Sequence, residues 1–505
     1  MNTAMIVGYG GVLLFTVLVI VIMSRGKRGD GTLSEYATAG RSFSSWFGTM
    51  SFLNTWLAGS VFVAFASFTI TVGVAGFYSL SYSLLAVVLM FFLAKPVNAW
   101  GRAHDLRTQA DLLGLRYGSR AVRVVAAVIG VIASVPWVVL GMQSLGVVFT
   151  ALSFGAVTPV VATIIGIVFI AIRQIWTTRL GTRGLIVSDM VQGLFAYGVG
   201  FLIIIGFLTW LLAHGHGLGQ VQTGLLTIPG PDSPFGPLYL FSLTLTGVLG
   251  AWSWPDVFVR LFSVRSPQAV QRSAVQAAPI LLLFSGGLVI VELLATSVPG
   301  VSEAPDYVWF TLAGLGGVGL VTAAGICVVA ATMGNVGANL QALGTQIAND
   351  VVGGGRTDSP TQSSRGAKIA VAAVTIVSAI IALATANLVT GIYLLAIVSY
   401  QAICQIAPAL LLGIFWRRGT AAAATSGMIA GILVAGILQV AYPNSIPWLG
   451  GLTSGVAGLI VNTAVYVVVS LAKPAPAAER SRVDALFAGL RVMPDTTVVT
   501  RVPVR

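Results

Sequence analysis

The sequence predicts an all-α polytopic membrane protein of about 13 transmembrane helices, with the N-terminus outside and the C-terminus inside. Composition, long apolar runs and the distribution of positive charge lead to this prediction. Of the 505 residues, 56% are hydrophobic and only 8% are charged, which is too apolar for a soluble chain. A net charge of +12 would be typical of a nucleic-acid-binding protein if the positive side chains gathered on one face of the protein. The few charges sit in short breaks between apolar runs, so we expect no nucleic-acid partner.

Each long apolar run is expected to form one helix, because crossing the hydrocarbon core takes about 20 apolar residues and the backbone there must satisfy its own hydrogen bonds. The first run has no preceding Lys or Arg and is followed by Arg25, Lys27 and Arg28, the reverse of a cleavable signal peptide. We therefore expect it to be retained. In order, the runs are residues 5–23, 47–72, 76–93, 124–152, 160–172, 185–212, 238–259, 277–298, 316–341, 369–385, 392–415, 421–440 and 453–471.

The positions of Lys and Arg predict the orientation, because these residues are retained on the cytoplasmic side. With the N-terminus outside, every break that carries Lys or Arg is internal, and all 27 of these residues are cytoplasmic. The outer loops then hold only acids such as Asp232, Glu303 and Asp306. If one span were missed, some breaks that carry Lys or Arg would fall on the outer side. The separation of the basic residues from the outer loops therefore supports the span count as well. We expect a multi-pass protein of the inner (plasma) membrane, in contact with the lipid bilayer.

Several classes of function lack their sequence features. No G-x-x-x-x-G-K-[S/T] loop occurs, which disfavours an ATP-driven pump within this chain. Both cysteines, Cys327 and Cys404, fall inside predicted spans, and there are only three histidines. We therefore expect no enzyme, no catalytic residue and no cofactor. An ion channel would need a repeated filter or ring, and a sensor would need a signalling domain in the short tail. Neither is visible, although both stay as alternatives.

Two spans carry helix-breaking and polar residues at membrane depth. The second span contains Asn54-Thr55-Trp56 followed by Gly59 and Ser60, and the seventh contains Gly250 followed by Trp252-Ser253-Trp254-Pro255-Asp256. They are five spans apart, which inverts the orientation, as an inverted repeat of five plus five helices requires. In such folds two discontinuous helices hold the solute near the midplane. Ordinary close packing of helices also favours small residues, so that interpretation stays open for either segment alone.

Three acidic residues lie inside predicted spans, where a carboxylate is expensive and suggests an ion path or a paired charge. Asp189 lies close to the inner end of its span, and both a helix-capping role and a role in cation passage are open. Asp256 is followed one turn later by Arg260, so a local ion pair and a role in transport are both open. Glu292 approaches the outer surface, where we expect it to be solvated.

Amide side chains gather in two later spans. Asn335 and Asn339 are four residues apart and share one helix face, so they either line a cavity or form hydrogen bonds between helices. Tyr400 and Gln401 precede Pro408, whose missing N–H frees a carbonyl on the preceding turn. This second group predicts a cavity wall or a hinge.

Three stretches resemble the sodium/solute symporter family: Tyr-Ala-Thr-Ala-Gly-Arg at 36–41, Arg-Gly-Leu-Ile-Val-Ser-Asp-Met-Val-Gln at 183–192, and Phe-Trp-Arg-Arg-Gly-Thr at 415–420, which leads to Gly427 and Gly431. The resemblance runs from the first span to Leu471. It implies a LeuT-like inverted repeat of five plus five helices with one leading and two trailing helices. It also implies secondary active uptake of a small polar solute, such as an organic acid, amino acid, sugar or vitamin, by cation-coupled alternating access.

On this arrangement the chain divides into six parts. They are a leading helix with a cytoplasmic loop (1–44), the first repeat (45–213), an extracellular loop (214–237), the second repeat (238–415), two trailing helices (416–472) and a cytoplasmic tail (473–505).

The resemblance also implies a site for a monovalent cation, made by backbone carbonyls and side chains of two helices. The chain has Gly334 and Asn335 where the family usually has two hydroxyls, and a hard cation such as sodium prefers oxygen ligands. Three alternatives for the coupling therefore stay open. The transport could be coupled to sodium, it could be coupled to a proton carried by Asp189 or Asp256, or the carrier could be independent of any cation. The residues implied in the cation site or its inner route are Leu53, Trp56, Ala331, Gly334, Asn335 and Asp189.

The residues expected to contact the solute come from the two interrupted spans and from the amide-rich spans. They offer amides, hydroxyls and indole rings, so they do not identify the solute. They are Asn54, Thr55, Ser60, Trp252, Trp254, Asn339, Tyr400 and Gln401.

Overall fold

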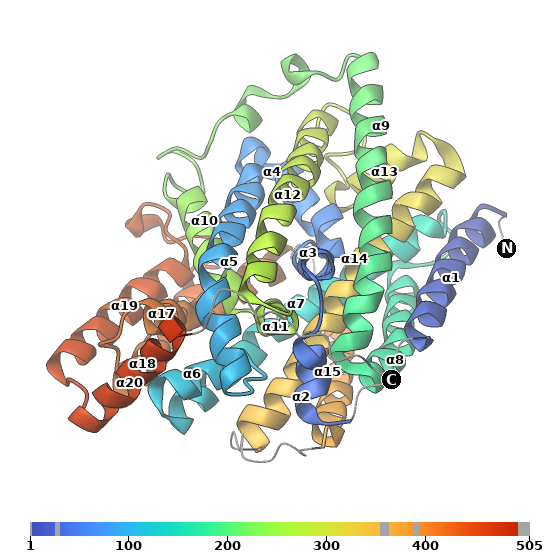
Figure 1. The fold of residues 1–505 in the computed structure, drawn as a ribbon. Helices are drawn as coiled ribbons and strands as arrows, with labels where there is room; N and C mark the ends of the chain where they lie inside the picture. Colours follow the sequence, from blue (N-terminus) through green and yellow to red (C-terminus); the bar gives the residue numbers. More distant parts are fainter. Residues whose placement is uncertain (1–2, 26–30, 354–362, 387–392, 493–505) are drawn as a thin grey trace.

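The computed structural model describes residues 3–25, 31–353, 363–386 and 393–492. Over these residues the chain is a bundle of helices that forms no β-strand (Figure 1). The all-α fold is therefore confirmed. The charged breaks around Lys27 and Arg356, the first residue of the predicted span 392–415 and the last part of the predicted tail lie outside the described residues.

Ten helical stretches of the described residues are long and apolar enough to cross a membrane, which supports a multi-pass protein. Two of them, Gly59–Ala103 and Pro159–Ala213, each contain a change of direction at a glycine with positive φ. The count of thirteen and the orientation stay predictions. The α-helices of the described residues, apart from the last one, are α1 (Thr3–Ser24), α2 (Leu33–Thr38), α3 (Ser45–Trp56), α4 (Ala64–Val72), α5 (Tyr78–Ala103), α6 (Gln109–Tyr117), α7 (Arg120–Leu152), α8 (Pro159–Gly193), α9 (Gly200–Ala213), α10 (Tyr239–Gly250), α11 (Pro255–Ser263), α12 (Pro267–Ala295), α13 (Val308–Gly314), α14 (Gly317–Gln346), α15 (Arg365–Ala384), α16 (Tyr393–Ile403), α17 (Gly413–Phe415), α18 (Ala421–Ala441) and α19 (Ser454–Ala472).

Helix α14 lies at the centre of the packing and contacts α1, α3, α7, α8, α11 and α15. Helices α18 and α19 lie at one side of the bundle together with α20 (Ala477–Val492), while α1 and α8 lie at the other side (Figure 1). The helix α20 belongs to the predicted tail, and the indole N–H of Trp100 on α5 donates to the carbonyl of Leu486 on α20 at 3.1 Å. The described part of the tail therefore docks on the bundle.

Both predicted interrupted helices are interrupted in the structure. After α3 ends at Trp56, the chain leaves helical geometry and makes a short turn, Gly59–Phe62, before α4 begins. A Cβ at Gly59 would lie 1.8 Å from Oγ1 of Thr332 on α14, so only glycine allows this approach. After α10, the turn Ala251–Ser253 leads to α11, which begins at Pro255. Proline suits a first helical position, where no N–H is needed.

The predicted break between spans 160–172 and 185–212 lies at Gly181. The helical stretch α8 runs from Pro159 to Gly193, but Gly181 has φ 64° and ψ −155°, which is not helical, so two helical parts meet there at a sharp kink without a long loop. A Cβ at Gly181 would lie 2.7 Å from the carbonyl oxygen of Tyr36, so the close contact with this residue requires glycine. A π-helical turn, Leu194–Val199, then joins α8 to α9. Of the polar residues that suggested a loop, Arg173, Gln174, Thr177 and Thr182 are buried, whereas Arg179 is exposed.

Candidate functional site

Aromatic rings from several helices gather beside the two interruptions. Trp254, which follows the break after α10, lies 5.3 Å from Trp137 on α7 and 5.4 Å from Tyr400 on α16, measured between ring centroids. Tyr82 on α5 continues the cluster, 5.6 Å from Tyr400 and 5.6 Å from Trp56 at the end of α3. The structure therefore brings the predicted solute residues Trp254 and Tyr400 together with both breaks. Such a cluster offers apolar ring faces and polar ring edges to a bound solute.

A hydroxyl group without a partner is buried at each interruption. The side chains of Ser60 and Ser253 are 1% and 0% exposed. Neither Oγ has a hydrogen-bond partner among the described residues. An unpartnered buried donor costs free energy that a bound acceptor would recover. Ser60 was a predicted solute contact, whereas Ser253 was not among the predicted contacts.

Of three further residues predicted to contact the solute, two form hydrogen bonds with other helices, and one has no hydrogen-bond partner among the described residues. The indole of Trp252 donates to the carbonyl of Ala86 on α5 at 2.9 Å, so it fixes the break rather than facing the aromatic cluster. Gln401 accepts from the backbone N–H of Gly455 at 2.8 Å and ties α16 to α19. Asn339 is 1% exposed, and neither of its amide atoms has a hydrogen-bond partner among the described residues.

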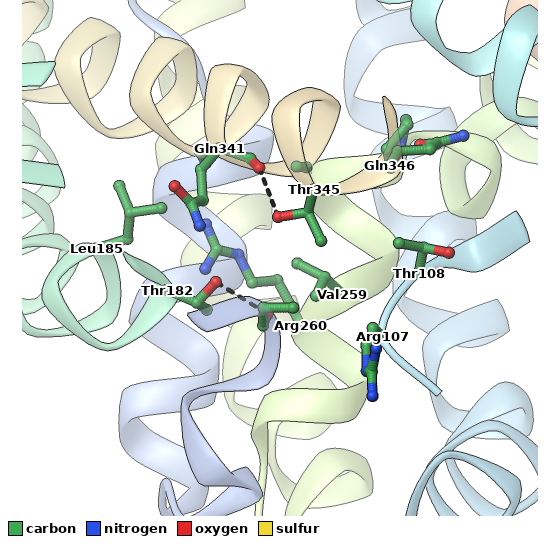
Figure 2. Close-up of a pocket in the computed structure, with 13 residues that line it drawn as sticks. Arg107, Thr108, Thr182, Leu185, Val259, Arg260, Gln341, Thr345 and Gln346 are labelled. Carbon is green, nitrogen blue, oxygen red and sulfur yellow. Dashed lines mark hydrogen bonds between the residues drawn. The ribbon is translucent and has the colours of Figure 1, made fainter. Parts of the chain in front are cut away.

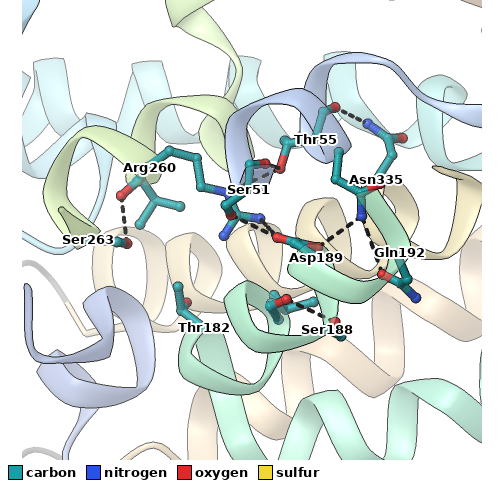
Figure 3. Close-up of polar contacts among 12 residues, drawn as sticks. Ser51, Thr55, Thr182, Ser188, Asp189, Gln192, Arg260, Ser263 and Asn335 are labelled. Carbon is teal, nitrogen blue, oxygen red and sulfur yellow. Dashed lines mark hydrogen bonds and ion pairs between the residues drawn. The ribbon is translucent and has the colours of Figure 1, made fainter. Parts of the chain in front are cut away.

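Asn54 and Thr55 belong to a charged network around Asp189 (Figure 3). Asp189 is 0% exposed and accepts from Oγ of Ser51 at 2.7 Å and from Nδ2 of Asn54 at 3.1 Å. Nη2 of Arg260 lies 3.7 Å from its Oδ2, and Nε of Arg260 donates to Oγ1 of Thr55 at 3.1 Å. The network therefore joins α3, α8 and α11.

This network decides two alternatives that the sequence left open. Asp189 does not cap a helix end, because α8 continues on both sides of it and encloses it in the bundle. Arg260 forms its ion pair with Asp189 rather than with Asp256, whose Oδ1 has no hydrogen-bond partner among the described residues. Arg173 and Arg260 lie in predicted breaks between apolar runs, but their side chains are only 1% and 2% exposed. The carboxylate of Asp189 compensates for burying them.

Glu292 is also not solvated. It is 3% exposed and faces Thr69 on α4, because α12 packs against α4 at this level. The sequence gives no sign of this contact, since α4 is the second half of an interrupted helix.

Two residues of the implied cation site lie where the end of α3 meets the middle of α14: Gly334 packs against the amide of Asn54, and Asn335 bonds to the carbonyl of Thr55. Leu53 and Ala331 are 0% exposed, and Asn335 is 2% exposed. Trp56 directs its indole N–H away, to Oγ of Ser83 at 2.8 Å. A side chain that the sequence did not indicate also reaches this place: the hydroxyl of Tyr197, from the π-helical turn, donates to the carbonyl of Leu53 at 2.9 Å.

A cavity lies beneath the second interruption, between α8, α11 and α14, in the half of the bundle that we predict to be cytoplasmic. Figure 2 shows Thr182, Arg260 and Gln341 directed toward it, with Arg107 and Thr108 at its far side. Arg260, which forms the ion pair with Asp189, therefore also lines this cavity.

The family model of the sodium:solute symporter family matches residues 36–431. The chain belongs to this family. Among its relatives, the uncharacterized symporter YhjB of Bacillus subtilis is 25% identical over 93% of this chain and 97% of that protein. The monocarboxylic acid transporter of Corynebacterium glutamicum is 24% identical over 84% and 82%. The sodium/pantothenate symporter of Escherichia coli is 25% identical over 84% and 88%.

Solved structures agree with the fold. A Na+-coupled sialic acid symporter in a substrate-bound outward-open state superimposes with a TM-score of 0.70 at 17% identity, over 94% of this chain and 99% of that one. Mhp1, a nucleobase-cation-symport-1 family transporter, gives a TM-score of 0.56 at 16% identity, over 89% and 98%. The chain is thus a multi-pass membrane protein that takes up a solute by coupling it to a cation.

Proposed function

We propose that the solute is a small monocarboxylate, bound between the two helix interruptions. Two relatives support this class by name: the monocarboxylic acid transporter of Corynebacterium glutamicum, and the monocarboxylate transport permease protein of Rhizobium johnstonii, which is 25% identical over 54% of this chain and 56% of that protein. The proposal assigns transport alone to the chain, with no catalytic step.

The unpartnered hydroxyls of Ser60 and Ser253 carry this proposal. A carboxylate oxygen only accepts hydrogen bonds, and each of these two free hydroxyls can donate one. The rings of Trp137, Trp254 and Tyr400 would then contact the short apolar part of the solute.

Uptake into proteoliposomes of the purified chain tests this proposal. With sodium and proton gradients imposed together, we expect uptake of labelled propionate and pyruvate and none of labelled glucose or glycine. A hydrogen bond to a charged group contributes about 1.5–3 kcal/mol, so Ser60→Ala and Ser253→Ala should each raise the KM for pyruvate about tenfold or more.

Ser426 provides the matched control, because its hydroxyl bonds only to its own helix at the outside of the bundle. Ser426→Ala should leave the KM unchanged. Uptake of glucose or glycine without uptake of either monocarboxylate would contradict the proposal. Equal KM values in the wild type and both site variants would remove the serines from it.

A further inference from the structure

The first oxygen ligands that the family implies for sodium are carbonyl groups at the end of α3. The carbonyl of Leu53 accepts from the hydroxyl of Tyr197 at 2.9 Å and from the backbone N–H of Leu57 at 2.7 Å. The carbonyl of Thr55, two residues further along α3, accepts from Nδ2 of Asn335 at 2.5 Å. These oxygens therefore direct lone pairs at donors of the chain itself.

The orientation of the Asn335 amide follows from the chemistry of its two neighbours. The indole N–H of Trp137 can only donate, and it lies 3.1 Å from Oδ1 of Asn335. The carbonyl of Thr55 can only accept, so it must face Nδ2. Reversing the amide would set donor against donor and acceptor against acceptor. The amide oxygen, which alone could bind a cation, thus faces Trp137.

The second missing hydroxyl is replaced in a similar way. A Cβ at Gly334 would lie 1.7 Å from Nδ2 and 2.5 Å from Cγ of Asn54, so the amide of Asn54 fills the space that a Ser or Thr there would need. This amide also presents its nitrogen, which donates to Oδ1 of Asp189 at 3.1 Å and to Oε1 of Gln192 at 3.3 Å. Its oxygen receives the hydroxyl of Tyr197 at 3.3 Å.

Two amide nitrogens thus stand where the family has two hydroxyl oxygens, and a hard cation is held by a shell of oxygens. We propose that this chain holds no sodium at the family position, that the side chains of Asn54 and Asn335 join α3 to its neighbours there in place of the ion, and that the coupling cation is a proton. The proposal rests on the proposed function in one respect, since it names the cation of that transport cycle.

Fixed positive charge supports this proposal. The guanidinium group of Arg260 bonds to Thr55 and lies 3.7 Å from Asp189 in the same buried network. A sodium ion beside it would meet a like charge in a region of low dielectric. A bound ion also joins two helices only while it is present, whereas the bond from Asn335 to the carbonyl of Thr55 joins α14 to α3 without any ion.

Binding of radioactive sodium to the purified full-length protein tests the proposal without any solute. We expect no saturable binding. Saturable binding to the wild type would overturn the proposal, whether or not uptake of any solute is detected. In proteoliposomes, pyruvate uptake under an acid-outside proton gradient should keep its rate when potassium replaces all sodium. Acceleration of uptake by a sodium gradient alone would overturn the proposal. If no solute is taken up under any gradient, the proposed function is contradicted. The measurement of sodium binding to the purified protein would still test whether the chain holds sodium.

A variant that restores hydroxyls gives a second, positive test. The triple variant Asn54→Ala, Gly334→Ser, Asn335→Ser removes both amides, frees the carbonyl of Thr55 and adds two hydroxyl oxygens. We expect it to gain saturable sodium binding. The control Asn335→Ala frees the same carbonyl without adding a hydroxyl and should gain none. A folded triple variant that binds no sodium would show that these side chains do not exclude the ion, and the proposal would fall. If the triple variant does not fold, wild-type sodium binding decides the question by itself.

Discussion

Replacing Asp189 by Asn removes the only negative charge that forms an ion pair with Arg260 in the described residues. The two side chains are 0% and 2% exposed, and their nearest atoms are 3.7 Å apart. The variant leaves a buried guanidinium whose remaining side-chain partner is the hydroxyl of Thr55. Replacing Arg260 by Met leaves the opposite charge, which still accepts from Ser51 and Asn54.

Breaking a buried ion pair from one side costs about 3–5 kcal/mol. We expect the lower end for each single variant, since Thr55 and Ser51 keep their bonds to the remaining group. For 505 residues, an unfolding entropy of about 2.1 cal/mol/K per residue gives about 1 kcal/mol per degree at the melting temperature. Each single variant should therefore melt about 3 °C below the wild type. The double variant removes both charges of this pair. The loss of the carboxylate near Arg173 occurs in the Asp189 single variant as well, so it cancels in the cycle, and the coupling energy between Asp189 and Arg260 should be about 2–3 kcal/mol.

The assay is thermal unfolding of the purified protein in detergent, followed by tryptophan fluorescence, for the wild type, both single variants and the double variant. Arg417 and Asp484 give the matched control, because they form an ion pair at 3.1 Å whose side chains are 44% and 63% exposed. Their cycle, Arg417→Met with Asp484→Asn, should show no measurable coupling. A coupling between Asp189 and Arg260 no larger than that of the exposed pair would refute the reasoning.

Three further predictions follow. Gly59→Ala places a methyl group 1.8 Å from Oγ1 of Thr332, so this variant should abolish pyruvate uptake. Adding Thr332→Ala to it should restore part of the uptake. An equal loss of uptake in the single and the double variant would contradict the close contact. Burial raises the pKa of Asp105, but the hydroxyl of Ser34 and nearby arginines outweigh burial and hold that pKa below its usual value. Asp105→Asn should therefore lower the melting temperature at pH 7. This effect should shrink as the pH falls below about 4, where the unfolded chain takes up the proton first, and disappear once the pH is below the lowered pKa of the folded protein. An effect that persists at still lower pH would contradict the bond. Asp256→Asn should slow pyruvate uptake driven by a proton gradient more than pyruvate exchange without a gradient, and equal slowing would exclude Asp256 from coupling.

The two interruptions could be predicted because their cause is local. Glycine and proline break helices wherever they lie, and Gly59 and Pro255 stand at the breaks themselves. The partner of Asp189 could not be predicted, because the sequence shows an apolar run that begins at residue 185 and suggests a helix end nearby. In the structure the break lies at Gly181, so Asp189 stands well inside the second helical part of α8 and faces Ser51 on α3 and Arg260 on α11.

The role of Asn335 shows a second limit. The sequence correctly places an amide where the family has a hydroxyl, and it leaves the choice between its oxygen and its nitrogen open. That choice depends on Trp137, a residue on another helix that donates to the oxygen. A single sequence contains no sign of this neighbour. Two of the expected cation-site residues therefore lie where α3 meets α14, while the atoms they present could be determined only from the three-dimensional contacts.

Arg260 connects the interruptions to the inner cavity. It lies on α11, the half-helix after the second break, and bonds to Thr55 in the last turn of α3, before the first break. Asp256 lies one turn before it on α11 and interacts with it electrostatically, so an ionised Asp256 competes with Asp189 for the guanidinium. A proton on Asp256 ends this competition and leaves Arg260 on Asp189, the arrangement in the structure. If the coupling cation is a proton, as proposed above, we expect loss of that proton to weaken the pair of Arg260 with Asp189, and Arg260 also lines the cavity of Figure 2. On that proposal one guanidinium links the charge of Asp256 to the contact between α11 and α8, and coupled alternating access requires a link of this kind.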